Sequence, residues 1–104
     1  MAKVEIFSGA CGFNTTVEAT MNGPKCALSV DSECDAIERL VEELGQVDPF
    51  QEISFRGEGP QTLRLGSKHC YHTACPVPVG IIKVIEIAAG LNLPVNASIK
   101  FIKD

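Results

Sequence analysis

The sequence lacks the features of nucleic-acid-binding and membrane proteins. Nine Lys and Arg residues stand against thirteen Asp and Glu residues, and no basic cluster appears that could neutralise phosphates. The longest apolar stretch, residues 77–93, is interrupted by Lys83, Glu86 and Asn92, so it is too short and too polar to span a bilayer. We therefore expect a soluble protein whose partners include neither nucleic acid nor a membrane.

The sequence also shows no internal repeats or low-complexity segments, and we expect no secretory signal. Its first residues, MAKVEIFSG, alternate like a strand and contain no apolar run with a cleavage site. We expect a cytoplasmic location, where thiols stay reduced. The 104 residues suffice for one hydrophobic core, so we predict a single domain over residues 1–104. No carboxylate pair or nucleophile–base spacing stands out, and the sequence predicts no particular reaction.

Alternation of apolar and polar residues predicts strands in the first third of the chain. Residues 3–6 alternate and predict a first strand, which ends at a Ser-Gly pair. Two further alternating runs, residues 16–21 and 26–31, flank the turn sequence Asn-Gly-Pro at 22–24. This arrangement predicts a β-hairpin.

Helical spacing of apolar residues predicts two helices. The first covers residues 33–44, and Ser32 with Asp35 resembles the capping box that begins many helices. The second covers residues 78–89, with Pro78 in its first turn, and is mostly buried because it carries few polar residues.

The rest of the chain gives weaker signals. Residues 46–74 show a poor pattern interrupted by Gly and Pro, and irregular segments of this length in a small domain are often functional. Residues 95–101 alternate again and predict a last strand. The order β-β-β-α-loop-α-β predicts an α+β fold, a two-layer sandwich with two helices on one face of a mainly antiparallel sheet.

Five cysteines are the strongest functional signal in the sequence. Their odd number argues against a disulfide framework and leaves metal binding, catalysis or burial. Cys26 begins a strand at the opposite edge of the sheet and points inward, so we interpret it as a core residue. Cys11 follows the first strand and Cys34 begins the first helix, which places both at one edge of an up-down-up sheet. If the second helix also starts at this edge, Cys70 and Cys75 arrive there too.

These four cysteines have the number of thiolates that a zinc site or an iron–sulfur cluster requires. Gly9 and Gly12 flank Cys11 and permit a tight backbone geometry whose amides can point at a sulfur or a bound cofactor. Pro76 directly after Cys75 matches the Cys-Pro ending of many bacterial cluster motifs. The sequence therefore predicts a metal site formed by four cysteines.

Simpler interpretations of individual residues stay open. Core packing explains Cys34 equally well, because free cysteine is among the most buried residue types. Cys70 and Cys75 are spaced more loosely than the paired CxxC motifs of zinc sites. His69 and His72 can ligate a metal or act as a base beside a thiol. Their simpler interpretation is as solvated loop residues, and we favour it more for His69.

The segments SGACGF near the start and HTACPVPVGIIKVIEIAAGL near the end resemble a family of small, uncharacterised cysteine-containing proteins of anaerobic bacteria and archaea. The resemblance covers nearly the whole chain and implies no established activity. It favours iron–sulfur chemistry and marks Cys11, Cys70, Cys75 and Pro76 as motif positions. The segment HTACPVPVGIIKVIEIA also resembles the cysteine-bearing helix of OsmC-type peroxidases, although this chain is short for that fold.

Three functions are compatible with these observations. The one we expect is a metal-binding module that holds an iron–sulfur cluster or zinc on Cys11, Cys34, Cys70 and Cys75, for electron transfer, sensing or stability, with a redox protein as partner. The second is a thiol enzyme in which Cys75 or Cys11 attacks a peroxide or disulfide and another cysteine resolves the product. The third is a binding or structural module with reduced bystander cysteines. The oligomeric state is left open.

Overall fold

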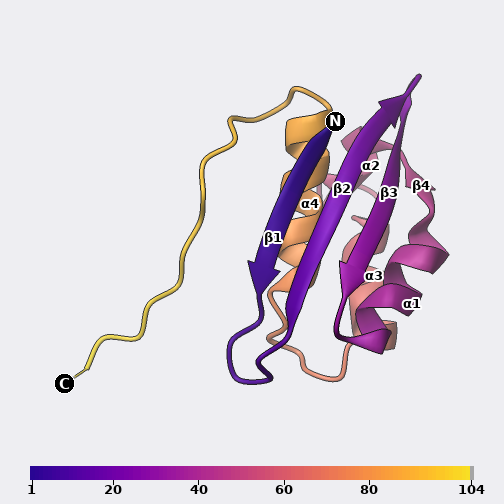
Figure 1. Cartoon of the computed structure of the whole chain (residues 1–104). Helices are drawn as coiled ribbons and strands as arrows, with labels where there is room; N and C mark the ends of the chain where they lie inside the picture. Colours follow the sequence, from indigo (N-terminus) through magenta and orange to yellow (C-terminus); the bar gives the residue numbers. More distant parts are fainter. Residues whose placement is uncertain (104) are drawn as a thin grey trace.

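An antiparallel sheet with helices on one of its faces makes up the computed structural model, which describes residues 1–103 (Figure 1). This arrangement confirms the predicted α+β class. In chain order the elements are β1 (Ala2–Phe7), β2 (Asn14–Asn22), β3 (Lys25–Ser32), α1 (Asp35–Leu44), β4 (Gln46–Val47), α2 (Pro49–Glu52), α3 (Gln61–His69) and α4 (Val77–Ala88).

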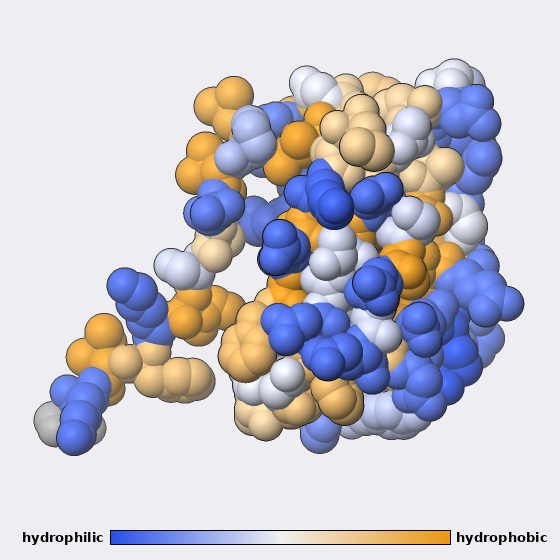
Figure 2. Space-filling model, in the orientation of Figure 1, coloured by the Kyte–Doolittle hydropathy of each residue, from blue (hydrophilic) through white to orange (hydrophobic). Residues whose placement is uncertain are grey.

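The strands lie in the order β1-β2-β3-β4, and each neighbouring pair is antiparallel. Val17 in β2 lies opposite Val4 in β1 and Val30 in β3, so the inward-facing residues of adjacent strands are aligned. The predicted hairpin turn is confirmed, and Gly23 at its centre has a φ of 63°, a conformation that suits glycine. Figure 2 shows hydrophilic residues on the outer face of the sheet, mixed with near-neutral residues and some apolar ones.

The core lies between the inner face of the sheet and the helices. Helix α4 packs against β1 and β2, helix α1 packs against β3, and α3 lies between α1 and α4 (Figure 1). None of the helices in residues 1–103 is long and apolar enough to cross a membrane. The buried apolar residues are Val17, Ala19, Cys26, Ala36, Ile37, Leu40, Val41, Leu44, Val47, Val77, Ile81, Val84 and Ile85.

Both predicted helices are present, but the first has a different cap. Helix α1 begins after Cys34, whose side chain forms no cap hydrogen bond, so the predicted capping box of Ser32 and Asp35 is wrong. Instead, the hydroxyl of Ser32 accepts a hydrogen bond of 3.1 Å from the backbone N–H of Cys34. The same hydroxyl forms a hydrogen bond of 2.8 Å with the hydroxyl of Thr15. Ser32 thus lies two residues before the N-cap and joins the start of α1 to β2.

The element order differs from the prediction in two places. The segment from residue 46 to 74, expected to be a loop, contains β4, α2 and α3. The strand predicted over residues 95–101 is absent from the described part of the chain, where these residues extend without pairing to the sheet. Alternation marks a segment that can form a strand, but a strand also needs a neighbour to which its backbone can bond.

A buried carboxylate organises the segment that the sequence pattern failed to resolve. Glu52 is 2% exposed, and its Oε1 accepts hydrogen bonds from the backbone N–H of Thr62 at 2.8 Å and from the Thr62 hydroxyl at 2.6 Å. Its Oε2 accepts a bond of 3.2 Å from the N–H of Gln61. The first N–H groups of a helix lack partners within the helix, and a negative charge there is favourable. Glu52 therefore fixes the start of α3.

Replacing this carboxylate should destabilise the fold. Glu52→Ala leaves the buried N–H and hydroxyl of Thr62 without an acceptor, so we expect a loss of about 1–3 kcal/mol of unfolding free energy. Urea denaturation followed by circular dichroism measures this loss. Glu58→Ala, which removes an exposed carboxylate from the same segment, is the matched control. Equal stability of the two variants would contradict the role assigned to Glu52.

Helix α4 approaches β1 closely at a glycine. Gly80 is buried, and a Cβ added there would lie 2.8 Å from Cγ1 of Ile6 and closer still to its Cδ1. Carbon atoms in contact normally lie about 3.5–4.0 Å apart. The absence of a side chain at position 80 thus sets how closely the helix lies on the sheet.

This contact predicts that the effect of a substitution at Gly80 on the unfolding free energy depends strongly on the residue at position 6. Gly80→Ala should lower the unfolding free energy by about 1–3 kcal/mol, because the added methyl group overpacks the interface. In an Ile6→Ala background the same change should become neutral or favourable, since alanine is the better helix former by about 1 kcal/mol. A double-mutant cycle by urea denaturation tests this coupling, and additive effects would refute it.

Candidate metal and thiol site

Three of the four cysteines predicted to form a site lie together at one end of the molecule. Cys34 precedes α1, Cys70 follows α3, and Cys75 lies in the turn before α4. All three are half-buried and pack against the hydrophobic core. We call Cys34, Cys70 and Cys75 the cysteine cluster.

Local backbone bonds hold two of these cysteines in place. The N–H of Cys70 donates to the carbonyl of Gly66 at 2.9 Å, which closes the last turn of α3. The N–H of Cys75 donates to the carbonyl of His72 at 3.3 Å and forms a tight turn. Pro76 then caps α4 and Pro78 lies in its first turn, as predicted.

Cys75 and Cys34 lie close enough to Cys70 to affect its ionisation. The pKa of Cys70 is raised to about 11, first by burial, then by the charge of Cys75 and its side-chain hydrogen bond, and finally by the charge of Cys34. A negative charge on Cys75 or Cys34 therefore disfavours a second negative charge on Cys70, and a bound cation would relieve this repulsion.

Cys11 lies apart from the cluster in an exposed loop between β1 and β2. This loop is closed by a hydrogen bond of 3.0 Å from the N–H of Ser8 to the carbonyl of Phe13, and by one of 2.8 Å from Gly12 to Gly9. Both glycines have positive φ, 88° at Gly9 and 75° at Gly12, as a tight loop requires. The loop lies at the same end of the sheet as the segment between α3 and α4 (Figure 1).

The two histidines do not join the cluster. His69 is the last residue of α3, and its Nε2 lies 2.9 Å from Oε1 of Glu43, which also binds Nζ of Lys68 at 3.0 Å. These contacts with His69 and Lys68 lower the pKa of Glu43. The interpretation of His69 as a loop residue is therefore wrong, because it ends a helix and pairs with α1. His72 is exposed.

A polar triad beside the cluster was not recognised in the sequence. Tyr71 lies between the cysteines of the loop, and its hydroxyl accepts a bond of 3.0 Å from Arg39 and donates one of 3.2 Å to Asp35. Arg39 also pairs with Asp35 at 3.2 Å, and both partners lower the pKa of that carboxyl. The spacing of Asp35 and Arg39 typifies an ion pair on a helix, but nothing local predicts Tyr71. The triad ties the Cys70 loop to the helix that follows Cys34.

Cys26 is fully buried in the hydrophobic core, as predicted, and burial raises the pKa of its thiol. It lies opposite Val47 of β4, at the end of β3 far from Cys34. Within residues 1–103, no group of three or more His, Cys, Asp or Glu side chains is already arranged as a metal site. What the fold assembles is a half-buried set of three thiols with the Cys11 loop at the same end.

A model of a family of unknown function, DUF6951, matches residues 2–101 of the chain. The protein belongs to this family. The match covers β1 through α4 and continues into the C-terminal segment, so these parts form one DUF6951 unit. No curated protein and no solved structure shows significant similarity to the chain.

The cysteines of this DUF6951 protein should differ in their rate of alkylation. We expect metal-free protein near pH 8 to react first at exposed Cys11 and last at buried Cys26. A pKa of about 11 in place of 9.0 leaves Cys70 roughly 100-fold less thiolate, and only the thiolate reacts. Raising the pH toward 11 should accelerate the modification of Cys70 strongly. Timed iodoacetamide treatment and peptide mass spectrometry measure these rates.

The matched variant is Cys75→Ser, which removes the neighbouring thiolate charge and should speed the reaction of Cys70. Because burial is the largest cause of the raised pKa, the rate should rise only part of the way toward that of an exposed cysteine. Equal reactivity of Cys11 and Cys70 in the metal-free protein would contradict the described environment.

Proposed function

We propose that the protein is a metal-binding module whose cysteine cluster, together with Cys11, holds an iron–sulfur cluster or a zinc ion. The observation that carries this proposal is the convergence of Cys34, Cys70 and Cys75 from three separate helix ends. Thiolates are the preferred ligands of zinc and of iron–sulfur clusters. A reducing cytoplasm would keep these thiols available.

The surroundings of the cluster suit such a group. Cys34 is the N-cap of α1 and Cys75 directly precedes the N-cap of α4, so both cysteines lie at helix N-termini. The dipole at a helix N-terminus is positive and stabilises a bound group that carries negative charge. Partial burial of the cysteine cluster restricts the access of water to it. The Cys11 loop lies at the same end of the sheet and could supply a fourth sulfur ligand. Binding at Cys70 must expel a proton, so affinity should rise with pH until its pKa of about 11 is passed.

The bound group would supply either one-electron redox chemistry or structural cross-linking of the helix ends. Iron–sulfur clusters transfer electrons at potentials set by solvent exposure and by hydrogen bonds to their sulfurs, whereas zinc stabilises the fold. The first case implies a redox protein as partner. In both cases Cys34, Cys70 and Cys75 bind the group, and Gly9 and Gly12 shape the loop that presents Cys11.

The proximity of Cys75 to Cys70, which contributes to the raised pKa of Cys70, favours a second candidate, a thiol-disulfide oxidoreductase. The thiolate of Cys75 would attack a substrate disulfide, forming a mixed disulfide and releasing one substrate thiolate. Cys70 would then attack Cys75, which releases the second substrate thiolate and leaves a Cys70–Cys75 disulfide. The substrate gains two electrons, and the protein loses two electrons and two protons.

Anaerobic purification followed by absorption spectroscopy and analysis of iron, sulfide and zinc tests the proposal. We expect stoichiometric metal in the native protein and its loss in Cys70→Ser and Cys75→Ser, because each variant removes a thiolate ligand. Cys26→Ala, which changes a cysteine outside the cluster, should retain the metal. Brown protein with iron and sulfide identifies an iron–sulfur cluster, and colourless protein with zinc identifies a zinc site.

Two variants separate the remaining outcomes. Loss of metal from Cys11→Ser establishes Cys11 as the fourth ligand, and retention limits the site to the cysteine cluster. Metal-free protein that forms a Cys70–Cys75 disulfide with a mild oxidant would replace the metal proposal by the oxidoreductase. Metal-free protein whose cysteines react slowly and form no disulfide would contradict both the metal-binding function and the oxidoreductase function.

A further inference from the structure

The C-terminal segment, residues 91–103, extends away from the rest of the molecule beyond the end of α4 (Figure 1). It makes the protein 47 Å long against 27 Å in the other two directions. Every residue of the segment is exposed, including large apolar ones: Ile99 is 86% and Phe101 100% exposed. Contiguous exposed apolar residues on a small protein indicate an interaction site.

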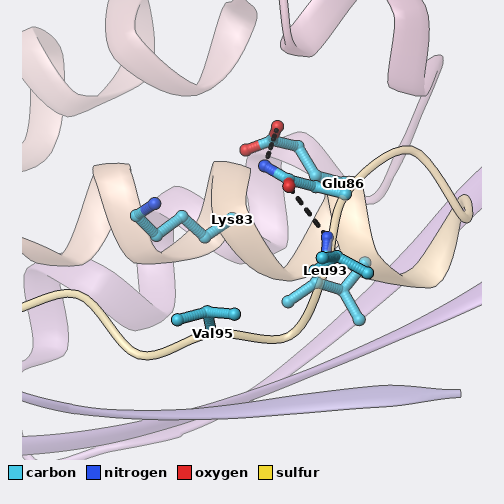
Figure 3. A pocket seen from close by; sticks show the side chains of 6 residues that line it. Lys83, Glu86, Leu93 and Val95 are labelled. Carbon is cyan, nitrogen blue, oxygen red and sulfur yellow. Dashed lines mark hydrogen bonds between the residues drawn. The ribbon is translucent and has the colours of Figure 1, made fainter.

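The root of this segment is held on the outer side of α4. The side-chain amide of Asn92 donates to Oε2 of Glu86 at 3.1 Å, and its oxygen accepts from the N–H of Leu93 at 2.8 Å. Leu93, Val95 and Lys83 line a shallow pocket beside the helix (Figure 3). Among the described residues, no hydrogen bond joins positions 96–103 to the rest of the chain. The segment is thus held at Asn92 and Leu93, and the residues that follow extend outward without partners in the described part of the chain.

Residues 95–101 have the composition of a strand with one buried face. The residues at 95, 97, 99 and 101 are apolar, those at 96, 98 and 100 are polar, and the run contains no Gly or Pro. Successive side chains of a strand point to opposite faces, so all apolar residues of this run lie on one side. The run is one residue longer than β1, Ala2–Phe7.

Strand β1 offers a free edge to such a segment. It is the first strand of the sheet, and only β2 pairs with it. In an antiparallel pair, about half of the backbone N–H and C=O groups of an edge strand point outward without a partner. The inward-facing Ala2, Val4 and Ile6 are only half-buried, whereas Val17 on β2 is fully buried. The core is therefore incompletely covered at this edge.

Charge and family membership agree with this pairing. The outer face of the sheet carries Lys3 and Lys25 against Glu5, Glu18 and Asp31, two positive charges against three negative ones. The described part of the C-terminal segment carries two lysines and no acidic residue. The family match extends to residue 101, so the alternating run belongs to the DUF6951 unit.

We propose that residues 95–101 of one copy of the protein add as a strand to the β1 edge of a second copy. Reciprocal exchange closes a twofold dimer, in which Ile99 and Phe101 cover the half-buried Val4 and Ile6 of the partner copy. Strand addition satisfies the free backbone groups of β1 and buries the apolar side of the segment in the same step. The assembly does not depend on what the cysteine cluster binds.

Light scattering coupled to gel filtration, applied to the full chain over a wide concentration range, tests this assembly. We expect a dimer that is lost in Ile99→Lys, because the substitution places a charge on the buried side of the added strand. Ser98→Lys, the matched control on the solvent side, should stay dimeric. Both positions lie outside the folded core, and circular dichroism checks that the body of each variant is intact.

A dimer of mixed isotope-labelled copies identifies the partner edge. Nuclear Overhauser contacts between residues 95–101 of one copy and β1 of the other support strand exchange. A monomeric native chain overturns the proposal, and protection of its residue 95–101 amides from hydrogen exchange would indicate pairing with its own β1. A dimer that persists in Ile99→Lys also overturns it, because its interface then lies elsewhere.

Discussion

The close approach of α4 to β1 is the constraint on which the rest of the structure depends. Gly80 allows the helix to lie against Ile6, and this position brings Val77, Ile81 and Val84 into the core. Because α4 packs against β1 and β2, the positions of both of its ends are also determined. Its start carries Cys75 to the end of the sheet where α1 begins, and its finish points the C-terminal segment away from the body. The close packing of Gly80 on Ile6 therefore helps to place both the candidate site and the exposed C-terminal segment.

The cysteine cluster depends on helix ends rather than on any continuous motif. Glu52 fixes the start of α3, whose last turn ends at Cys70, while Tyr71 bonds to the charged pair on α1. Each sulfur is then set by a different element, and all three elements pack on the same core. Such an arrangement keeps thiols close without a tight sequence spacing, which explains why Cys70 and Cys75 match no CxxC pattern.

The periodicity of apolar residues predicted those helices and strands that bury one regular face in the core. Residues 3–6 and 78–89 are examples, because the sheet and α4 each bury a regular set of apolar positions. Helix α3 escaped prediction, since its buried residues are Thr62 and Gly66 and a remote carboxylate stabilises its start. For the site, strand direction correctly brought Cys34 to the end of the sheet where Cys70 and Cys75 also lie. The contact between α1 and Tyr71 is a tertiary interaction that no local pattern encodes.

The alternation at residues 95–101 and the extended conformation of that segment are two aspects of one property. A strand with one apolar side is stable only where another surface covers that side. In a single copy of the protein the apolar side chains of residues 95–101 stay exposed to water. The edge that suits it, β1, leads directly into the loop that carries Cys11. A strand bound at this edge would restrain the end of β1 and with it the loop, because paired strands open less readily than free edges. We therefore expect the Cys11 loop to be more ordered in the proposed dimer than in a single copy.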